Sequence, residues 1–157
     1  MSKDVHDVIY RKLKELEKNL ILLKQLTDVK RENLKEDMIK YWGIERGIQI
    51  CIECTIDIGN IVISVTDNDK PATYKETMAT LSNIGIIPKK FSENLSKMVG
   101  FRNILVHDYT KIDESVILHI LNNELQDFVK FIEYINNWLD GNANSKGEWL
   151  CKKILMM

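Results

Sequence analysis

The sequence carries almost no excess charge. Its 22 lysines and arginines face 23 aspartates and glutamates, which leaves a formal net charge of −1. Such a chain has no global field to draw it onto nucleic acid or a membrane surface, so any site for a polyanion must be local. With 157 residues, 45% of them hydrophobic, the chain is long enough to form one domain with a sizeable core.

Several motifs of well-known chemistry are also missing. The chain has no glycine-rich phosphate loop, no paired-aspartate metal motif and no Ser-His-Asp order. It has three cysteines, an odd number that favours a reducing compartment over a disulfide framework. Cys51 and Cys54 have no second Cys or His pair at metal-ligand spacing, so they predict buried thiols rather than a zinc or redox site. We therefore expect neither a metal nor a cofactor.

Neither a signal peptide nor a membrane-spanning segment is evident from the sequence. The N-terminus becomes charged at once, at Lys3, Asp4 and Asp7. We find no apolar run long enough to cross a bilayer. These features predict a cytoplasmic protein that does not enter a membrane.

Apolar residues recur at helical spacing along most of the chain, which predicts an all-α fold of about five helices. Residues 1–140 are expected to form this domain, and residues 141–157 a tail with a possible short docked helix. The turn between the first two helices is expected over residues 27–33. The expected helices are residues 4–27 (capped by Ser2 or Asp4), 34–66, about 73–82 (opened by Thr73 and Glu76), 88–107, and one from Thr110 or Asp113 to about 140.

The second of these helices is apolar nearly all round between Gly47 and Val65. A helix that is apolar on every side must be covered on every side, so we expect a second subunit to supply part of the cover. Its polar residues keep to one helical stripe. Within it, Glu53 and Asp57 are open to two interpretations: structural pairing with Arg46 or Arg102, or support of an active site.

The segment from Gly100 to Tyr109 is the most informative stretch of the chain. Arg102 continues the apolar helical row of Phe91, Leu95 and Met98, where a guanidinium is costly unless it is paired or lines a polar cleft. Asn103 and His107 share a helical face beside it. A permanent cation, an amide and an imidazole, followed by Asp108 and Tyr109, can hold an anion and move a proton.

This segment, Arg-Asn-Ile-Leu-Val-His-Asp-Tyr, resembles the motif of the HEPN superfamily and, in its longer form Arg-x4-His-x-Tyr, that of the HepT-like branch. Residues Glu45, Arg46 and Gln49 and the surroundings of Asp57 resemble this branch as well. The resemblance covers residues 5–140. It implies a HEPN-type helical bundle and a homodimer with both motifs at a shared cleft.

The same resemblance implies a metal-independent endoribonuclease, the toxin of a type VII toxin–antitoxin pair. The substrate RNA would supply its own 2′-OH nucleophile, with Arg102 at the phosphate and His107 as acid or base, while Asn103 would hydrogen-bond the phosphate or orient the histidine. We expect Asp108, Glu53 and Asp57 to support them, although the resemblance assigns no role to Glu53 and Asp57. It further implies that a minimal nucleotidyltransferase of the MntA type, the antitoxin, adenylylates Tyr109.

Two other interpretations are compatible with the residues. In one, the protein is a non-catalytic helical subunit in which Arg102 and His107 hold a nucleotide or the active site of a nucleotidyltransferase partner. In the other, it is a purely structural helical dimer in which Arg102 only pairs with Glu53 or Asp57.

Overall fold

The computed structural model describes residues 1–107 and 114–142. Over these ranges the protein is helical and has no β-strand, so the predicted all-α fold is confirmed. Helices α1, α3, α4 and α5 and the run from α6 to α7 form the bundle of about five helices, to which α2 is an addition. The bounds are α1 (Lys3–Lys24), α2 (Arg31–Glu36), α3 (Met38–Ser64), α4 (Tyr74–Asn83), α5 (Lys89–His107), α6 (Glu114–His119), the π-helical segment η1 (Ile120–Glu124) and α7 (Leu125–Asn142).

Local signals place most of the helix ends where the sequence predicts them. The Ser2 hydroxyl accepts from the Val5 amide at 3.3 Å, and the Thr73 hydroxyl accepts from the Glu76 amide at 3.2 Å. Gly85 has φ 82°, the left-handed conformation that ends α4. Thr110 and Asp113, the predicted caps of the last helix, lie outside the described residues, as does the tail after residue 142.

The predicted boundary between the first two helices is wrong. The turn expected over residues 27–33 already contains the start of α2, and the expected helix 34–66 is interrupted at Asp37. Asp37 leaves the helical conformation, with φ −123° and ψ 89°, and its carboxylate accepts from the Lys40 amide at 3.1 Å. An aspartate that caps the following helix thus divides the apolar pattern into two helices.

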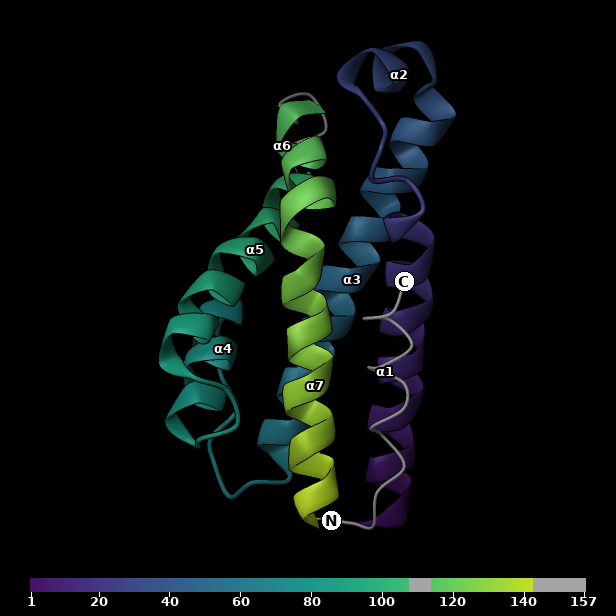
Figure 1. The fold of residues 1–157 in the computed structure, drawn as a ribbon. Helices are drawn as coiled ribbons and strands as arrows, with labels where there is room; N and C mark the ends of the chain where they lie inside the picture. The colour runs from purple at the N-terminus through teal and green to yellow at the C-terminus, as the bar shows by residue number, and fades with distance from the viewer. Residues whose placement is uncertain (108–113, 143–157) are drawn as a thin grey trace.

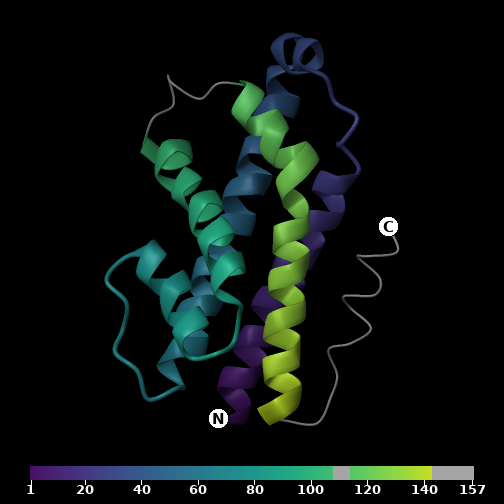
Figure 2. The same ribbon diagram turned by 60° about the vertical axis from the view of Figure 1, so that its left-hand side comes forward.

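Helix α3 runs through the middle of the bundle, with α1 and α7 on one side and α4 and α5 on the other (Figures 1 and 2). This packing covers most of the apolar part of α3 within one chain, while Ile50 and Ile61 stay only partly buried. The expectation that a second subunit supplies part of the cover stays a prediction. The buried residues of α3 are Ile44, Ile48, Cys51, Ile52, Cys54, Thr55, Ile56, Ile58, Gly59, Val62 and Ile63.

By length and composition α3 would be able to cross a membrane, contrary to the expectation from sequence that no such segment exists. Its most apolar window has a mean hydropathy of 1.4, and 56% of that window is buried inside the protein. The central helix of a helical bundle meets the same criterion, because neighbouring helices rather than lipid surround it.

The close approach of α4 to α3 depends on Gly59. A Cβ atom at this position would lie 2.9 Å from Cγ2 of Thr77, closer than carbon atoms pack. Beside it, the Thr77 hydroxyl donates to the side-chain oxygen of Asn60 at 2.9 Å. The glycine and this hydrogen bond together fix how α4 lies along α3, and therefore where the first residue of α4, Tyr74, is held.

The last predicted helix contains a π-helical segment that the sequence does not reveal. The predicted apolar row is nevertheless confirmed, since each of its members is at most 5% exposed. These members are Ile117, Leu121, Leu125, Phe128, Ile132, Ile135 and Leu139. Near the π-helical segment, His119 Nε2 lies 3.1 Å from Oε1 of Glu124. Burial, together with the hydrogen bond and charge of Glu124, raises the pKa of Asp127 to about 6.

Replacing Asp127 with asparagine should change how stability depends on pH. The pKa of Asp127 is raised from an ordinary 3.8 to about 6 in the folded protein. Between pH 3.8 and about 6 the folded protein therefore binds more protons at this carboxyl group than the unfolded protein does. Wild-type stability should therefore fall as pH rises through this window and level off above it. Thermal unfolding of Asp127→Asn should show a smaller fall and a gain at neutral pH of at most ~1 kcal/mol, because the side chain is only half-buried.

The matched control is Asp69→Asn, which removes a carboxylate from an exposed loop. Its melting temperature should change with pH in the same way as that of the wild-type protein. If Asp127→Asn does so too, the altered titration of Asp127 is refuted.

Candidate active site

Arg102 occupies the core-facing row of α5, as the sequence predicts. Phe91, Leu95, Met98 and Leu105 on this row are at most 7% exposed. The Arg102 side chain, in the same row, is 27% exposed. A guanidinium this far from bulk solvent requires polar partners, and they come from two neighbouring helices.

Two side chains from other helices contact the Arg102 guanidinium. Its closest approach to Glu53 of α3 is made through Nε, which lies 4.0 Å from Oε1. Its Cζ lies 5.0 Å from the ring centroid of Tyr74, at the start of α4, a cation–π distance. Gln49 donates to the same Glu53 oxygen at 3.1 Å and so orients the carboxylate. Helices α3, α4 and α5 therefore all contribute to placing this cation.

Sequence reasoning missed Tyr74 as part of the site. A tyrosine directly after an N-cap is ordinary, and nothing in its own surroundings links it to Arg102 across the chain. The contact exists because Gly59 lets α4 approach α3 closely, a relation that only the packed structure shows.

The polar stripe of α3 is divided among three neighbouring helices. Glu53 turns to Arg102 of α5, whereas Asp57 forms an ion pair of 3.1 Å with Lys12 of α1. Asn60 accepts from Thr77 of α4. Of the two acidic residues expected near the site, the structure brings Glu53 to Arg102 and gives Asp57 a partner elsewhere. The contact of Glu53 agrees both with a structural role and with support of a site.

The remaining predicted residues follow Arg102 along the chain. Asn103 is exposed on α5, and His107 is the last residue of that helix that the structure describes. Asp108 and Tyr109 lie outside the described residues. Asn103 and His107 therefore follow Arg102 within two turns of the same helix.

The cysteine pair does not form a second site. Cys51 and Cys54 are free and buried in α3, as predicted. Burial raises the pKa of both thiols, that of Cys54 to about 12. Thiols that stay protonated at neutral pH are neither good nucleophiles nor good metal ligands, so these residues contribute to packing.

The arrangement around Arg102 is suited to bind an anion. The guanidinium is always charged, and the carboxylate and ring that contact it restrict its orientation in advance. Because its side chain retains 27% of its exposure, an anion arriving from solvent can still reach it. Pre-oriented, partly desolvated cations of this kind stabilise charge that develops on a bound phosphate.

Comparison with known proteins agrees with the motif. Residues 16–135 match the family described as "Ribonuclease HepT-like". The chain is 28% identical over 131 residues to the mRNA nuclease HepT of Shewanella oneidensis, and the aligned region covers 83% of this chain and 98% of that protein. It is 24% identical over 132 residues to the tRNA nuclease HepT of Aphanizomenon flos-aquae, which spans 84% of this chain and 90% of that one.

A solved structure shares the fold. It is described as the tri-AMPylated Shewanella oneidensis HEPN toxin in complex with MNT antitoxin, and it superimposes with a TM-score of 0.69 at 28% identity, covering 86% of this chain and 98% of the toxin. Since the family match extends over most of the chain and the bundle is the same, this protein belongs to the HepT-like ribonuclease family of HEPN proteins.

Proposed function

We propose that this chain is a cytoplasmic, metal-independent endoribonuclease that acts as the toxin of a toxin–antitoxin pair. The observation that carries the proposal is the half-buried Arg102, which contacts Glu53 of α3 and Tyr74 of α4. Arg102 lies on α5, the helix that also bears Asn103 and His107. Relatives over most of the chain are an mRNA nuclease and a tRNA nuclease. The substrate is therefore RNA.

The reaction follows from the chemistry of RNA itself. The ribose 2′-OH attacks the adjacent phosphorus as its proton passes to a base, and the 5′-oxygen leaves as it receives a proton. The products are a 2′,3′-cyclic phosphate and a 5′-hydroxyl. His107 takes or gives one of these protons, while Arg102 binds the phosphate and offsets the charge that grows on its equatorial oxygens. Asn103 donates a hydrogen bond to the phosphate, and Asp108 lies next to the histidine in sequence.

Glu53 acts as a positioning residue rather than a catalytic one. Its carboxylate approaches Nε of Arg102, so it orients the guanidinium from the side away from the terminal nitrogens, which are the natural fork for a phosphate. Asp57, paired with Lys12, is a more distant support that keeps α1 against α3.

Purified protein should cleave RNA in the presence of EDTA, and His107→Ala should remove this activity while circular dichroism remains helical. We expect a loss of about 10²–10⁴-fold, the usual contribution of a general acid or base. Arg102→Ala should lose about 10²–10³-fold, as for removal of one charge-stabilising donor. Glu53→Gln should lose less than either and should be partly corrected by raising the substrate concentration.

The matched control is His6→Gln, which removes a histidine from α1, on the other side of α3 from α5. It should cleave RNA like the wild-type protein. If the wild-type protein leaves a range of RNAs intact, or if His107→Ala cleaves as well as His6→Gln, the proposed activity is wrong. Nucleotide-dependent stabilisation without RNA products would instead support a non-catalytic binding subunit.

The partner that we propose is a small nucleotidyltransferase, which transfers AMP to Tyr109. A related toxin has been solved in an AMPylated state bound to an MNT antitoxin. A phosphodiester and a base on Tyr109, close in sequence to Arg102 and His107, would repel and obstruct an incoming RNA phosphate.

Incubation with this nucleotidyltransferase and ATP should add AMP to the peptide that contains Tyr109 and abolish RNA cleavage. Tyr109→Phe should remain active and unmodified under the same conditions, whereas Tyr10→Phe on α1 should be modified and inhibited like the wild-type protein. Mass spectrometry of the peptides decides the outcome, and AMP found only on other residues would refute this assignment.

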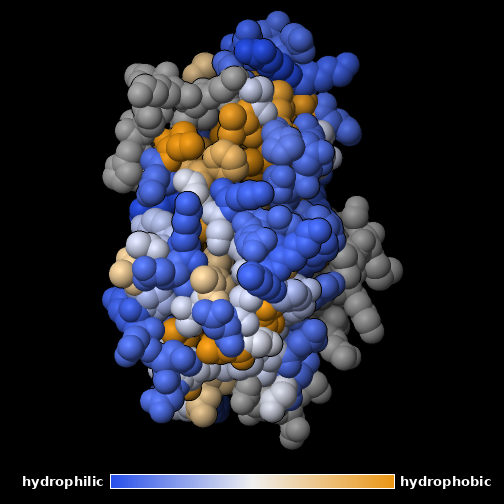
Figure 3. Space-filling model, turned by 90° about the vertical axis from the view of Figure 1, so that its left-hand side faces the viewer, coloured by the Kyte–Doolittle hydropathy of each residue, from blue (hydrophilic) through white to orange (hydrophobic). Residues whose placement is uncertain are grey.

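A homodimer is the assembly that we propose, with exposed hydrophobic side chains at the start of α3 as part of its contact surface. Three of the six exposed large hydrophobic side chains in the described residues lie on the first turns of α3, where Met38, Ile39 and Trp42 are 48%, 79% and 61% exposed. Ile104 of α5 is 41% exposed. Figure 3 shows hydrophobic surface gathered toward this end of the bundle, near α2. Apolar groups this exposed are typical of an interface.

The double substitution Ile39→Lys/Trp42→Lys should convert the dimer to a monomer, because it places two charges in the proposed contact. Light scattering coupled to size exclusion at micromolar concentration measures the mass directly. Leu22→Lys, which changes a 51% exposed leucine on α1, serves as the matched control and should leave the mass unchanged. A wild-type monomer, or a dimer that survives the double substitution, would contradict this surface.

A further inference from the structure

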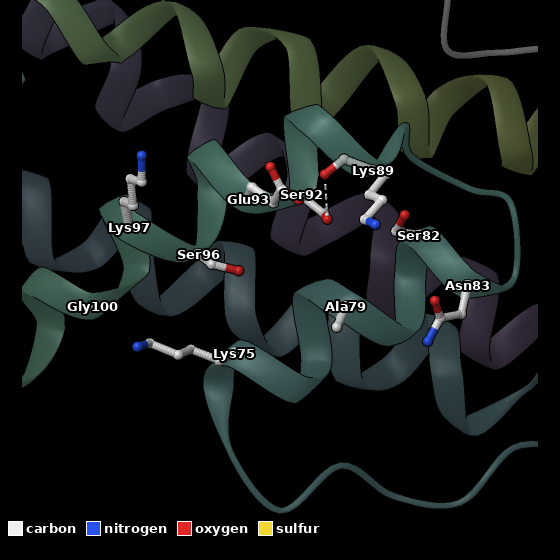
Figure 4. Close-up of a pocket in the computed structure, with 10 residues that line it drawn as sticks. All are labelled: Lys75, Ala79, Ser82, Asn83, Lys89, Ser92, Glu93, Ser96, Lys97 and Gly100. Carbon is white, nitrogen blue, oxygen red and sulfur yellow. Dashed lines mark hydrogen bonds between the residues drawn. The ribbon is translucent and has the colours of Figure 1, made fainter.

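A groove between α4 and α5 lies beside the Arg102 site and has no part in the mechanism described above. Its cavity measures about 730 Å³. Residues from α4 and from α5 line it, and most of them are small or polar (Figure 4). No aromatic ring is among the described residues that line it.

The groove is locally basic on a chain that is not. Three lysines, Lys75, Lys89 and Lys97, and one acidic residue, Glu93, line it. None of the three lysines forms an ion pair with any residue in the described part of the chain, whereas Lys12 and Arg31 elsewhere pair with carboxylates. In Figure 4, Lys75 extends along the groove and Lys89 reaches from α5 toward Ser82, whereas the side chain of Lys97 points away from α4. A concentration of unpaired cations on a chain of net charge −1 indicates a place for an anion.

The floor of the groove can supply further contacts to such an anion. Ser92, Ser96 and Gly100 succeed one another at four-residue spacing, so they lie on one row of α5. The Ser92 hydroxyl donates to the Lys89 carbonyl at 2.7 Å, while Ser96 makes no hydrogen bond with another described residue. A Cβ at Gly100 would meet nothing within 4 Å, so the groove is open at that end.

The end of the groove formed by Lys75 and Gly100 lies next to residues of the Arg102 site along both helices. Gly100 lies on α5 immediately before the segment that carries Arg102, and Lys75 follows Tyr74, whose ring contacts the guanidinium. Asn103 and His107 continue the helical row of Ser96 and Gly100. Between Ser92 and Gly100 the helix rises by ~12 Å, which is long enough for a strand rather than a single phosphate.

We infer that this groove binds the phosphate backbone of the RNA strand next to the cleaved phosphate, an inference that rests on the proposed function. Lysines and hydroxyl groups contact phosphates without reading sequence, and the absence of an aromatic lining excludes base stacking as the main interaction there. The groove therefore adds affinity for longer RNA and is indifferent to its sequence. Arg102 and His107 act on the cleaved phosphate, which lies at the end of the groove.

The test measures binding in the His107→Ala background, so that RNA stays intact. Fluorescence anisotropy is recorded over a range of salt concentrations with an oligoribonucleotide of about 12 nucleotides, within the length that single-strand grooves cover, and with a trinucleotide. The groove variant is Lys75→Gln/Lys89→Gln/Lys97→Gln. The matched control removes the same charge from α1 with Lys3→Gln/Lys14→Gln/Lys18→Gln.

The groove variant should bind the longer RNA up to about 100-fold more weakly at ~0.1 M salt, and the slope of log K against log salt should fall by about 2, since each phosphate contact on a single strand contributes about 0.7. The α1 control should keep both the affinity and the slope. The corresponding triple lysine-to-arginine variant should also keep the affinity, because it retains the charges.

Equal binding by the groove variant and the α1 control would overturn the inference, as would an absence of RNA binding. A groove variant that binds RNA normally but loses affinity for the nucleotidyltransferase would show that the groove is a protein contact, which overturns it too. If the wild-type protein fails to cleave RNA while binding still depends on the groove lysines, the proposed function fails and the groove assignment stands.

Discussion

The contact of the Arg102 guanidinium with the Glu53 carboxylate and the Tyr74 ring is the constraint on which the rest of the site depends. A permanent cation on a core-facing row destabilises the bundle unless other helices supply partners for it. Here α3 supplies the carboxylate at 4.0 Å and α4 the ring at 5.0 Å. The cation is thereby oriented in advance, and it keeps enough exposure to meet a second anion.

The scaffold around this contact is built to hold three helices at fixed positions. Helix α3 contributes eleven buried residues and packs against helices on both of its sides, so it serves as the axis of the bundle. Gly59 allows α4 to approach that axis, and the hydrogen bond from Thr77 to Asn60 sets its position along it. Because Tyr74 is the first residue of α4, a shift of this helix would move the ring away from the guanidinium. A substitution at Gly59, distant in sequence from the motif, therefore acts on the site through packing.

Much of this architecture is predictable from the sequence, because local chemistry decides it. Ser2, Thr73 and Gly85 mark helix ends with side-chain caps or a left-handed conformation that any context would favour. The apolar row that contains Arg102 is equally clear from spacing. What the sequence does not show are features set by packing between distant segments, such as the contact of Tyr74 with Arg102 and the separate partners of Glu53 and Asp57.

Apolar periodicity also leaves two features of α3 undetermined, namely the helix break at Asp37 and the source of the residues that cover it. A continuous apolar pattern is compatible with one helix or two, and only the capping geometry of Asp37 separates them. An apolar surface must be covered, but periodicity alone does not say whether the cover comes from the same chain or from another. In this bundle neighbouring helices of the same chain supply most of it, and three of the large hydrophobic side chains left exposed, Met38, Ile39 and Trp42, lie at the start of α3.

In the proposed reaction the RNA supplies the nucleophile and the protein stabilises the developing charge. Three lysines without an ion pair among the described residues line the groove between α4 and α5, which we propose as the local site for a polyanion on a chain without net positive charge. The most direct measurement compares, in EDTA, an oligoribonucleotide with one that carries a single 2′-deoxy residue at the cleavage position. Only the first should be cut, and its upstream fragment should end in a 2′,3′-cyclic phosphate. Cleavage of the deoxy-substituted strand at the same bond would contradict the proposed reaction.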